Sequence, residues 1–331
     1  MKVQKGGDSS SRSGEKLVWF GALAVSSVGL TVGNKALKMA YPYNNALMII
    51  QNAMTVLCLI AGNFMGKIVF KPFTSRQVRI FFFSSVLLAL QIVTALLALD
   101  HVAIATVAIF RNLSMLLVGI IDTVVFKTPM GPEKGAALML VVAGSIIYAG
   151  FDANYSSVGY FWQTCNSVIY IVNTFYNKIY QTALQRGNEQ TAEGNALVEQ
   201  CWTLLWGGVF GYAAGEFAPG GAIHGLTTMS AATRTTLLAT GFLALLISSA
   251  YNHVYELEAA TTVAVAANVN KAIAIVMGAV LFQTIFVANQ VLGLIICMLG
   301  GVWYSIASKK RGNSSTWAIV TFLGLSKEKT M

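Results

Sequence analysis

Two basic residues, Arg111 and Lys271, lie inside long apolar stretches of this 331-residue chain. At ~1.5 Å per residue, each lies ~14 to 17 Å from the end of its stretch, near the middle of a ~30 Å hydrocarbon layer. A lone charge at that depth costs at least ~2.5 to 3.5 kcal/mol, so each cation needs a carboxylate partner, an anionic ligand or water. The chain therefore offers two interior sites that could bind an anion.

The acidic residues that could neutralise these cations lie near the ends of the apolar stretches. Their scarcity favours an anionic ligand as the partner of Lys271, whereas for Arg111 a ligand and a carboxylate remain equally open. Glu199 lies about one turn inside its stretch, and the others are Asp100, Asp122, Asp152, Glu216, Glu256 and Glu258.

Amide side chains accompany both cations. Asn268, Asn270 and Lys271 fall within one helical turn, with Asn268 and Lys271 on the same face, and Asn112 follows Arg111. Such donors suit phosphate oxygens, which accept charge-assisted hydrogen bonds. Bonding between neighbouring helices is the alternative role for the amides, and it remains equally open.

The composition shows which elements must position these residues. Only 11% of the residues are charged and 56% are hydrophobic, against roughly 25% charged residues in a soluble domain. We therefore expect an all-α membrane protein with ten transmembrane helices. All five prolines lie between or at the ends of the ten apolar segments, which are 17–38, 44–66, 80–99, 102–125, 135–151, 158–180, 195–215, 236–256, 260–283 and 286–307.

The basic residues predict the orientation in the bilayer. With both termini in the cytosol, 17 of the 22 Lys and Arg residues face the cytosol and three face the opposite side. This asymmetry follows the positive-inside rule. The net charge of +9 is therefore a topology signal and does not indicate nucleic-acid binding.

An internal repeat relates the two halves of the chain at an offset of 156 residues. The offset places Asn112 on Asn268, Gly144 on Gly300 and Tyr148 on Tyr304. Five helices in each half predict inverted repeats, which transporters use for alternating access. We expect a tail over 1–16, repeats over 17–152 and 153–308, a second tail over 309–331, and an insertion within 216–234.

The sequence contains no HExxH zinc motif and no phosphate-binding GxxxxGK[ST] loop, so we expect neither an enzyme nor a cofactor.

Gly207, Gly211 and Gly215 form a stripe that favours packing within the bundle over a homodimer interface. Tyr251 and Asn252 are candidates for lining a substrate cavity, with helix packing as the equal alternative.

Several motifs resemble those of the nucleotide-sugar transporters of the drug/metabolite transporter superfamily, in particular the GDP-mannose transporter branch. Ala267-Asn268-Val269-Asn270-Lys271 resembles the family's ninth-helix motif, and Phe110-Arg111-Asn112-Leu113-Ser114 resembles its fourth-helix motif. The resemblance covers about residues 17–311. It implies that Asn270 and Lys271 contact the phosphate and sugar. We also expect Arg111 and Asn112 to line or brace the cavity.

The chain departs from this family where helix seven reads guanine. The family's Phe-Tyr-Asn-Asn is replaced by Leu197-Val198-Glu199-Gln200, so both amides are lost. The Glu199 carboxylate can still accept from guanine N1–H and N2–H₂ together, and this is our hypothesis for base recognition.

The expected function is exchange of a cytosolic nucleotide sugar, GDP-mannose or a related GDP-sugar, for lumenal GMP in the Golgi. A UDP-sugar transporter, a triose-phosphate-type translocator and a non-transporting scaffold are the alternatives. Lys327 and Lys329 resemble a dilysine signal for coat machinery, which would place the chain in the Golgi or the endoplasmic reticulum.

Overall fold

The computed structural model describes the chain except residues 1–7, 126–130, 187–190, 258–259 and 310–331, and it omits some side chains within the helices. The described residues form ten long helices and one short helix, with no strand. The helices are α1 (Asp8–Ala40), α2 (Asn44–Phe64), α3 (Ser75–Leu99), α4 (Ile104–Val125), α5 (Pro132–Gly150), α6 (Ser157–Arg186), α7 (Ala192–Ala213), α8 (Ala222–Thr228), α9 (Ala231–Leu257), α10 (Ala260–Leu281) and α11 (Ala288–Lys309).

Each predicted apolar segment lies largely on one long helix, and the differences are at the ends. α1 begins at Asp8, within the region predicted to be a tail, because a helix can continue with polar residues beyond its apolar run. α3 begins before the apolar run, where the Thr74 hydroxyl and the Gln77 side chain form a capping box. The predicted insertion contains the short helix α8.

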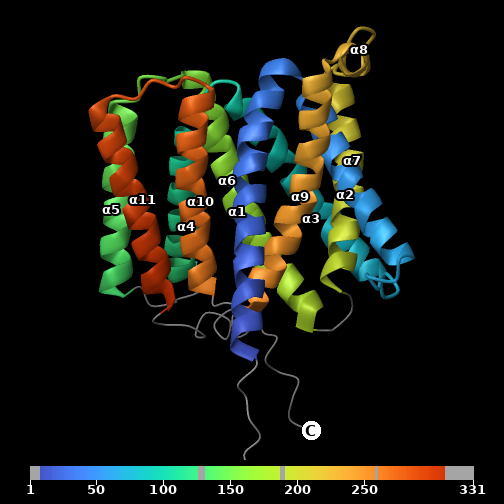
Figure 1. The fold of residues 1–331 in the computed structure, drawn as a ribbon, viewed down its shortest axis with the longest axis horizontal. Helices are drawn as coiled ribbons and strands as arrows, with labels where there is room; N and C mark the ends of the chain where they lie inside the picture. The colour runs from blue at the N-terminus through green and yellow to red at the C-terminus, as the bar shows by residue number, and fades with distance from the viewer. Residues whose placement is uncertain (1–7, 126–130, 187–190, 258–259, 310–331) are drawn as a thin grey trace, which may run out of the picture.

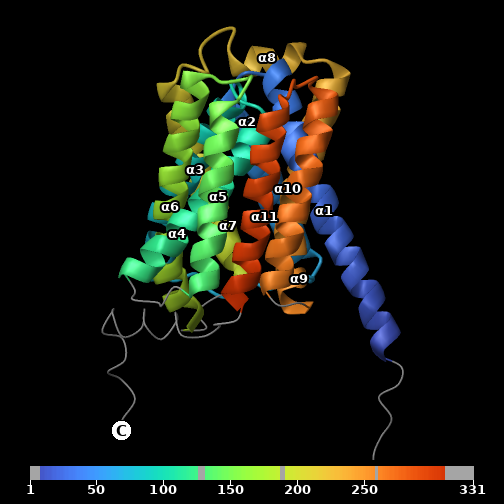
Figure 2. The same cartoon turned by 90° about the vertical axis from the view of Figure 1, so that its left-hand side faces the viewer.

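Six helices are long and apolar enough to cross a membrane, and the bent pair α8 and α9 would make a seventh span, within the described residues. The long helices stand side by side, and the described ends of α1 and α11 lie on the same side of the bundle (Figures 1 and 2). Large apolar side chains such as Phe64 and Val124 face outward, whereas polar side chains such as Gln77 and Gln163 are buried. This distribution is that of a multi-pass membrane protein.

The main helix contacts join the first half of the chain to the second. α1 packs against α9 and α10, α2 against α7 and α9, α3 against α6 and α7, and α4 against α6. α5 packs against α11 at one end of the bundle (Figure 1). The bundle is therefore built from interleaved halves.

Glycines allow close backbone approach at two of these contacts. A Cβ at Gly144 of α5 would lie 2.4 Å from the Cys297 nitrogen of α11, so only glycine fits there. On α7, Gly207 packs against Met48 and Ile49 of α2. This part of the α7 glycine stripe is thus used within the bundle, as expected, and a homodimer remains a prediction.

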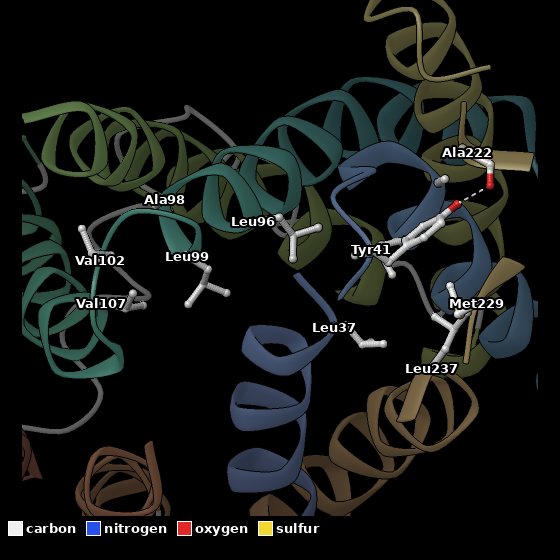
Figure 3. Close-up of a cluster of buried hydrophobic side chains, with 12 residues drawn as sticks. Leu37, Tyr41, Leu96, Ala98, Leu99, Val102, Val107, Ala222, Met229 and Leu237 are labelled. Atoms are coloured by element: carbon white, nitrogen blue, oxygen red, sulfur yellow. Dashed lines mark hydrogen bonds between the residues drawn. The ribbon is translucent and has the colours of Figure 1, made fainter. Parts of the chain in front are cut away.

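The turn between α1 and α2 is anchored in a buried apolar cluster at the end of the bundle that carries α8 (Figure 3). The Tyr41 hydroxyl donates to the Ala222 carbonyl oxygen at 2.9 Å. Burial, and to a lesser degree the nearby Glu216, raises the pKa of Tyr41 to about 12, so its hydroxyl stays protonated at physiological pH. This bond ties the α1–α2 turn to the start of α8.

Candidate functional site

Lys271 lies halfway along α10 and turns its ammonium group toward α4. Its Nζ donates to the side-chain oxygen of Asn112 at 2.8 Å and to that of Asn268 at 3.2 Å. Both asparagines are almost fully buried. Neutral amide oxygens thus orient this cation without neutralising it.

Asn270 adds donors to the same turn of α10. Its side chain is buried, and its Nδ2 has no hydrogen-bond partner. An unpaired buried donor is costly, and such groups in native proteins are normally satisfied by water or a ligand. The Lys271 ammonium and the Asn270 amide therefore leave unused donor capacity in the interior of the bundle.

α11 closes the site on the side of the two asparagines. A Cβ at Gly301 would lie 3.3 Å from Asn112 Nδ2 and 3.5 Å from Asn268 Oδ1. Asn112 Nδ2 also meets the sulfur of Met298 at 3.5 Å, which is a weak acceptor. The missing side chain at Gly301 gives the two amides room to reach Lys271.

Arg111 has a different environment from Lys271. Its side chain is exposed, although it lies near enough to Lys271 for the two charges to repel one another. Among the described side chains, no carboxylate lies within salt-bridge distance of either cation. No described carboxylate therefore neutralises the positive charge of Lys271 or of Arg111 near it.

The acidic residues considered as partners have other roles where the structure describes them. Asp100 pairs with Lys38 at 3.0 Å. Glu216 accepts from the backbone nitrogens of Asn45 and Ala46 at the start of α2. Asp152 accepts from the Tyr160 hydroxyl and the Gln290 amide, both at 2.8 Å. None of these three carboxylates is therefore the partner of Arg111 or Lys271.

Glu199 lies on α7 and contacts α3. The Ser84 oxygen is 2.6 Å from Glu199 Oε1 and 2.9 Å from the side-chain oxygen of Asn177 on α6. Glu199 keeps part of its surface accessible, and the neighbouring Gln200 has a buried Oε1 without a partner. This second polar cluster is formed by α3, α6 and α7, whereas the Lys271 cluster is formed by α4, α10 and α11.

Polar residues of α6 that the sequence analysis missed extend the Glu199 cluster. Asn177 Nδ2 donates to Asn173 Oδ1 at 3.2 Å, and Asn173 Nδ2 donates to Gln91 Oε1 of α3 at 3.1 Å. Asn166 Nδ2 also reaches the backbone oxygen of Gln91. The spacing of these asparagines, seven and four residues apart on one face of α6, is a signal that could have identified them.

Some predicted residues lie outside the described part of the chain. The side chains of Tyr251 and Asn252 are not described, and neither are Lys327 and Lys329 or the side chain of Asp122. Their predicted roles remain predictions.

No protein-family model matches the chain. It is 23% identical to the GDP-mannose transporter GONST1 of Arabidopsis thaliana over 53% of this chain and 52% of that protein. It is 22% identical to the GDP-mannose transporter GONST2 of the same plant over 88% of this chain and 78% of that protein.

A third relative is the GDP-fucose transporter 1 of Arabidopsis thaliana, 28% identical over 54% of this chain and 53% of that protein. The chain thus spans about half the length of two of these relatives and over three quarters of the third. These proteins are named as transporters of GDP-sugars. The resemblance to nucleotide-sugar transporters is therefore confirmed, since the chain is similar to proteins named as GDP-mannose and GDP-fucose transporters.

Proposed function

We propose that this protein is an antiporter that exchanges a GDP-sugar, GDP-mannose or a close relative, for GMP. The observation that carries the proposal is the Lys271 ammonium, held in the interior by the amides of Asn112 and Asn268 with no described carboxylate beside it. An anionic substrate supplies the missing charge. The names of the relatives support a GDP-sugar as that anion.

The phosphates of the substrate bind at the Lys271 cluster. Lys271 provides a charge-assisted donor, and the unpaired Nδ2 of Asn270 provides a neutral one. Arg111 adds positive charge on the neighbouring helix, and Asn112 and Asn268 orient the Lys271 ammonium. Pyrophosphate and monophosphate present the same oxygens to these donors, so both members of the exchange use one site.

The nucleobase binds at the Glu199 cluster. Guanine presents N1–H and N2–H₂ side by side, and the two oxygens of the Glu199 carboxylate can accept both. The unpaired Oε1 of Gln200 is a further acceptor in the same turn of α7. Uracil presents a single N–H between two carbonyl oxygens, which makes it a poorer partner for a carboxylate.

Alternating access comes from two inverted five-helix repeats, 17–152 and 153–308. The helix contacts support this assignment. The repeat would pair α1 with α6, α2 with α7, α3 with α9, α4 with α10, and α5 with α11. Under this pairing, the contact between α1 and α9 corresponds to one between α6 and α3, and the contact between α1 and α10 corresponds to one between α6 and α4. Both of these contacts occur in the bundle. Rocking of the repeats about the interior site then exposes it to each side in turn.

We place the carrier in the Golgi membrane, or in the endoplasmic reticulum, with both termini in the cytosol. The distribution of basic residues supports this orientation. In the same orientation Lys327 and Lys329 face the cytosol, where coat machinery would bind them. The imported sugar then supplies glycosylation in the lumen.

Counterflow in proteoliposomes tests the function. Vesicles preloaded with GMP should accumulate labelled GDP-mannose, and those preloaded with UMP or CMP should accumulate it more slowly. Preferential exchange of UDP-sugars would show that the carrier recognises uracil and not guanine. Exchange of triose phosphate alone would identify an organic-phosphate translocator, and no exchange of any of these would favour a non-transporting scaffold.

A further inference from the structure

The turn between α2 and α3, residues 65–74, joins two helices that are each long and apolar enough to cross a membrane. It lies at the edge of the bundle (Figure 1). The described start of α1 is at the same end of the bundle, because α2 runs back from the α1–α2 turn. In the proposed orientation this end faces the cytosol, so the turn lies at the cytosolic surface of the membrane.

The backbone of this turn is fixed by contacts within the protein. Gly66 ends α2 in the left-handed conformation, with a φ of 68°, and the Lys67 nitrogen donates to the Gly62 carbonyl oxygen at 3.0 Å. The Thr191 hydroxyl, which caps α7, donates to the Val69 carbonyl oxygen at 3.2 Å. The side chains along the turn therefore have defined directions.

Large apolar side chains on this turn are exposed. Phe64, the last residue of α2, is 87% exposed, and Val69 is 69% exposed. Phe73, two residues before α3, is 46% exposed. Beside two membrane-spanning helices, such side chains are stabilised where lipid covers them. They indicate that the turn rests in the interfacial layer of the bilayer.

Basic residues are interleaved with these apolar side chains. Residues 64–79 include four basic residues and no acidic residue, which gives the segment a formal charge of +4; the four are Lys67, Lys71, Arg76 and Arg79. Lys67 and Arg79 are exposed. The positive-inside rule explains the sign of this charge, but it does not require exposed apolar side chains between the cations. The combination of the two is the pattern that binds anionic lipid surfaces.

One face of α3 shows how the cations lie relative to the membrane. Arg76, Arg79 and Phe83 follow one another at spacings of three and four residues, so they share one face of the helix, and all three are exposed. Phe83 lies inside the apolar run and Arg76 lies at the start of the helix. Arg79 is ~6 Å from Phe83 along the axis. Its long side chain can therefore reach the lipid phosphates while its stem stays on the apolar surface.

We propose that this segment is a binding site for the headgroups of anionic phospholipids in the cytosolic leaflet. We call it the α2–α3 patch, and its residues are Phe64, Lys67, Val69, Phe73, Arg76 and Arg79. The apolar side chains insert beside the acyl chains, and the basic side chains donate to the lipid phosphate. A phosphatidylinositol phosphate carries an additional phosphate monoester, so it binds more tightly than phosphatidylserine, and neutral phosphatidylcholine binds most weakly. This proposal does not depend on what the protein transports.

Binding of an acyl-labelled phosphatidylinositol phosphate to the purified full-length protein in uncharged detergent micelles tests the proposal. The wild type should bind this lipid more tightly than acyl-labelled phosphatidylcholine. Each cation near an anionic lipid contributes about fivefold in affinity, so Lys67→Gln combined with Arg79→Gln should weaken binding about 25-fold. Lys67→Arg combined with Arg79→Lys keeps both charges and should retain binding.

Lys134→Gln combined with Arg234→Gln is the matched control, because it removes two cations outside the patch, at the starts of α5 and α9. It should bind the lipid as the wild type does, and the melting temperatures show whether all variants fold. An equal loss in the control, or equal affinity for the anionic and the neutral lipid, would overturn the proposal. Displacement of the lipid by an equal concentration of soluble inositol phosphate would assign the patch to soluble anions and would also overturn it.

Discussion

The side-chain oxygens of Asn112 and Asn268 accept hydrogen bonds from the same ammonium group, that of Lys271. The two asparagines are 156 residues apart, which is the offset of the predicted repeat, so two positions that this repeat would make equivalent meet at one cation. A charge placed between such positions contacts both halves of the chain. A substrate anion bound there would also contact both.

Replacing Lys271 by Met should strongly reduce exchange while the empty protein stays folded. The variant loses about 1.5 to 3 kcal/mol of charge-assisted bonding to phosphate, or about 10- to 150-fold in affinity. It also removes an interior charge that has no described counterion, which offsets the loss of the hydrogen bonds to Asn112 and Asn268, so the melting temperature of the empty carrier should change little. Nucleotide-dependent stabilisation and counterflow measure the two effects. Lys67→Gln at an exposed site is the control, and a loss of folding in Lys271→Met would contradict the interpretation.

Replacing Asn112 by Asp places a carboxylate 2.8 Å from the Lys271 ammonium, at the position of the present amide oxygen. The new ion pair should stabilise the empty carrier and block substrate anions, so thermal stability rises while counterflow falls. The double variant with Lys271→Met provides the control, because the carboxylate introduced by Asn112→Asp would there be unpaired and destabilising. Unchanged transport in the single variant would exclude anion binding at this cluster.

Sequence reasoning could place Asn268 and Lys271 on one face of a helix, because residues three apart are neighbours on any helix. The repeat offset also indicated Asn112 as the partner position of Asn268. Arg111 was harder to place, since adjacent helical residues point about 100° apart and Asn112 occupies the face toward Lys271. The orientation of α4 about its axis decides which residue faces α10, and the surrounding helices set it.

The Glu199 cluster shows what sequence reasoning could not reach. Glu199 was a candidate because it is an acid inside an apolar segment. Its contact with Ser84 joins residues 115 positions apart, and serine is common enough in apolar helices to carry no signal by itself. The positions of Asn173 and Asn177 relative to Ser84 depend on how α3 packs against α6.

Replacing Gly301 by Ala should weaken transport by crowding the two asparagines. The added Cβ would lie 3.3 Å from Asn112 Nδ2 and 3.5 Å from Asn268 Oδ1, closer than side chains usually approach in the first case. We expect a several-fold rise in the KM for the nucleotide with folding retained. Gly135→Ala on α5 is the matched control, because no atom lies within 4 Å of its added Cβ. Equal transport by both variants would show that the amide positions are unimportant.

Replacing Glu216 by Gln should lower stability and leave base selectivity unchanged. The Glu216 carboxylate accepts from the backbone nitrogens of Asn45 and Ala46 and from the Asn45 side chain, all within 3.1 Å. Loss of such a cap at the start of a helix costs about 1 to 2 kcal/mol. The melting temperature of the purified carrier measures the loss, and Glu15→Gln at an exposed site is the control. A changed ratio of GDP-sugar to UDP-sugar exchange would contradict a purely structural role.

Replacing Glu199 by Gln should weaken guanine nucleotides more than uridine nucleotides. The carboxylate accepts two guanine donors at once, whereas the glutamine amide that replaces it offers one acceptor and one donor, and the donor would face guanine N1–H or N2–H₂. We expect at least a tenfold loss of affinity for GMP, consistent with hydrogen bonds to a charged group, and a smaller change for UMP. Competition of unlabelled GMP and UMP against labelled substrate in the same vesicles gives both values. Because the phosphate donors of the Lys271 cluster are unchanged in this variant, an equal loss for both nucleotides would assign Glu199 to packing and leave base recognition to other residues.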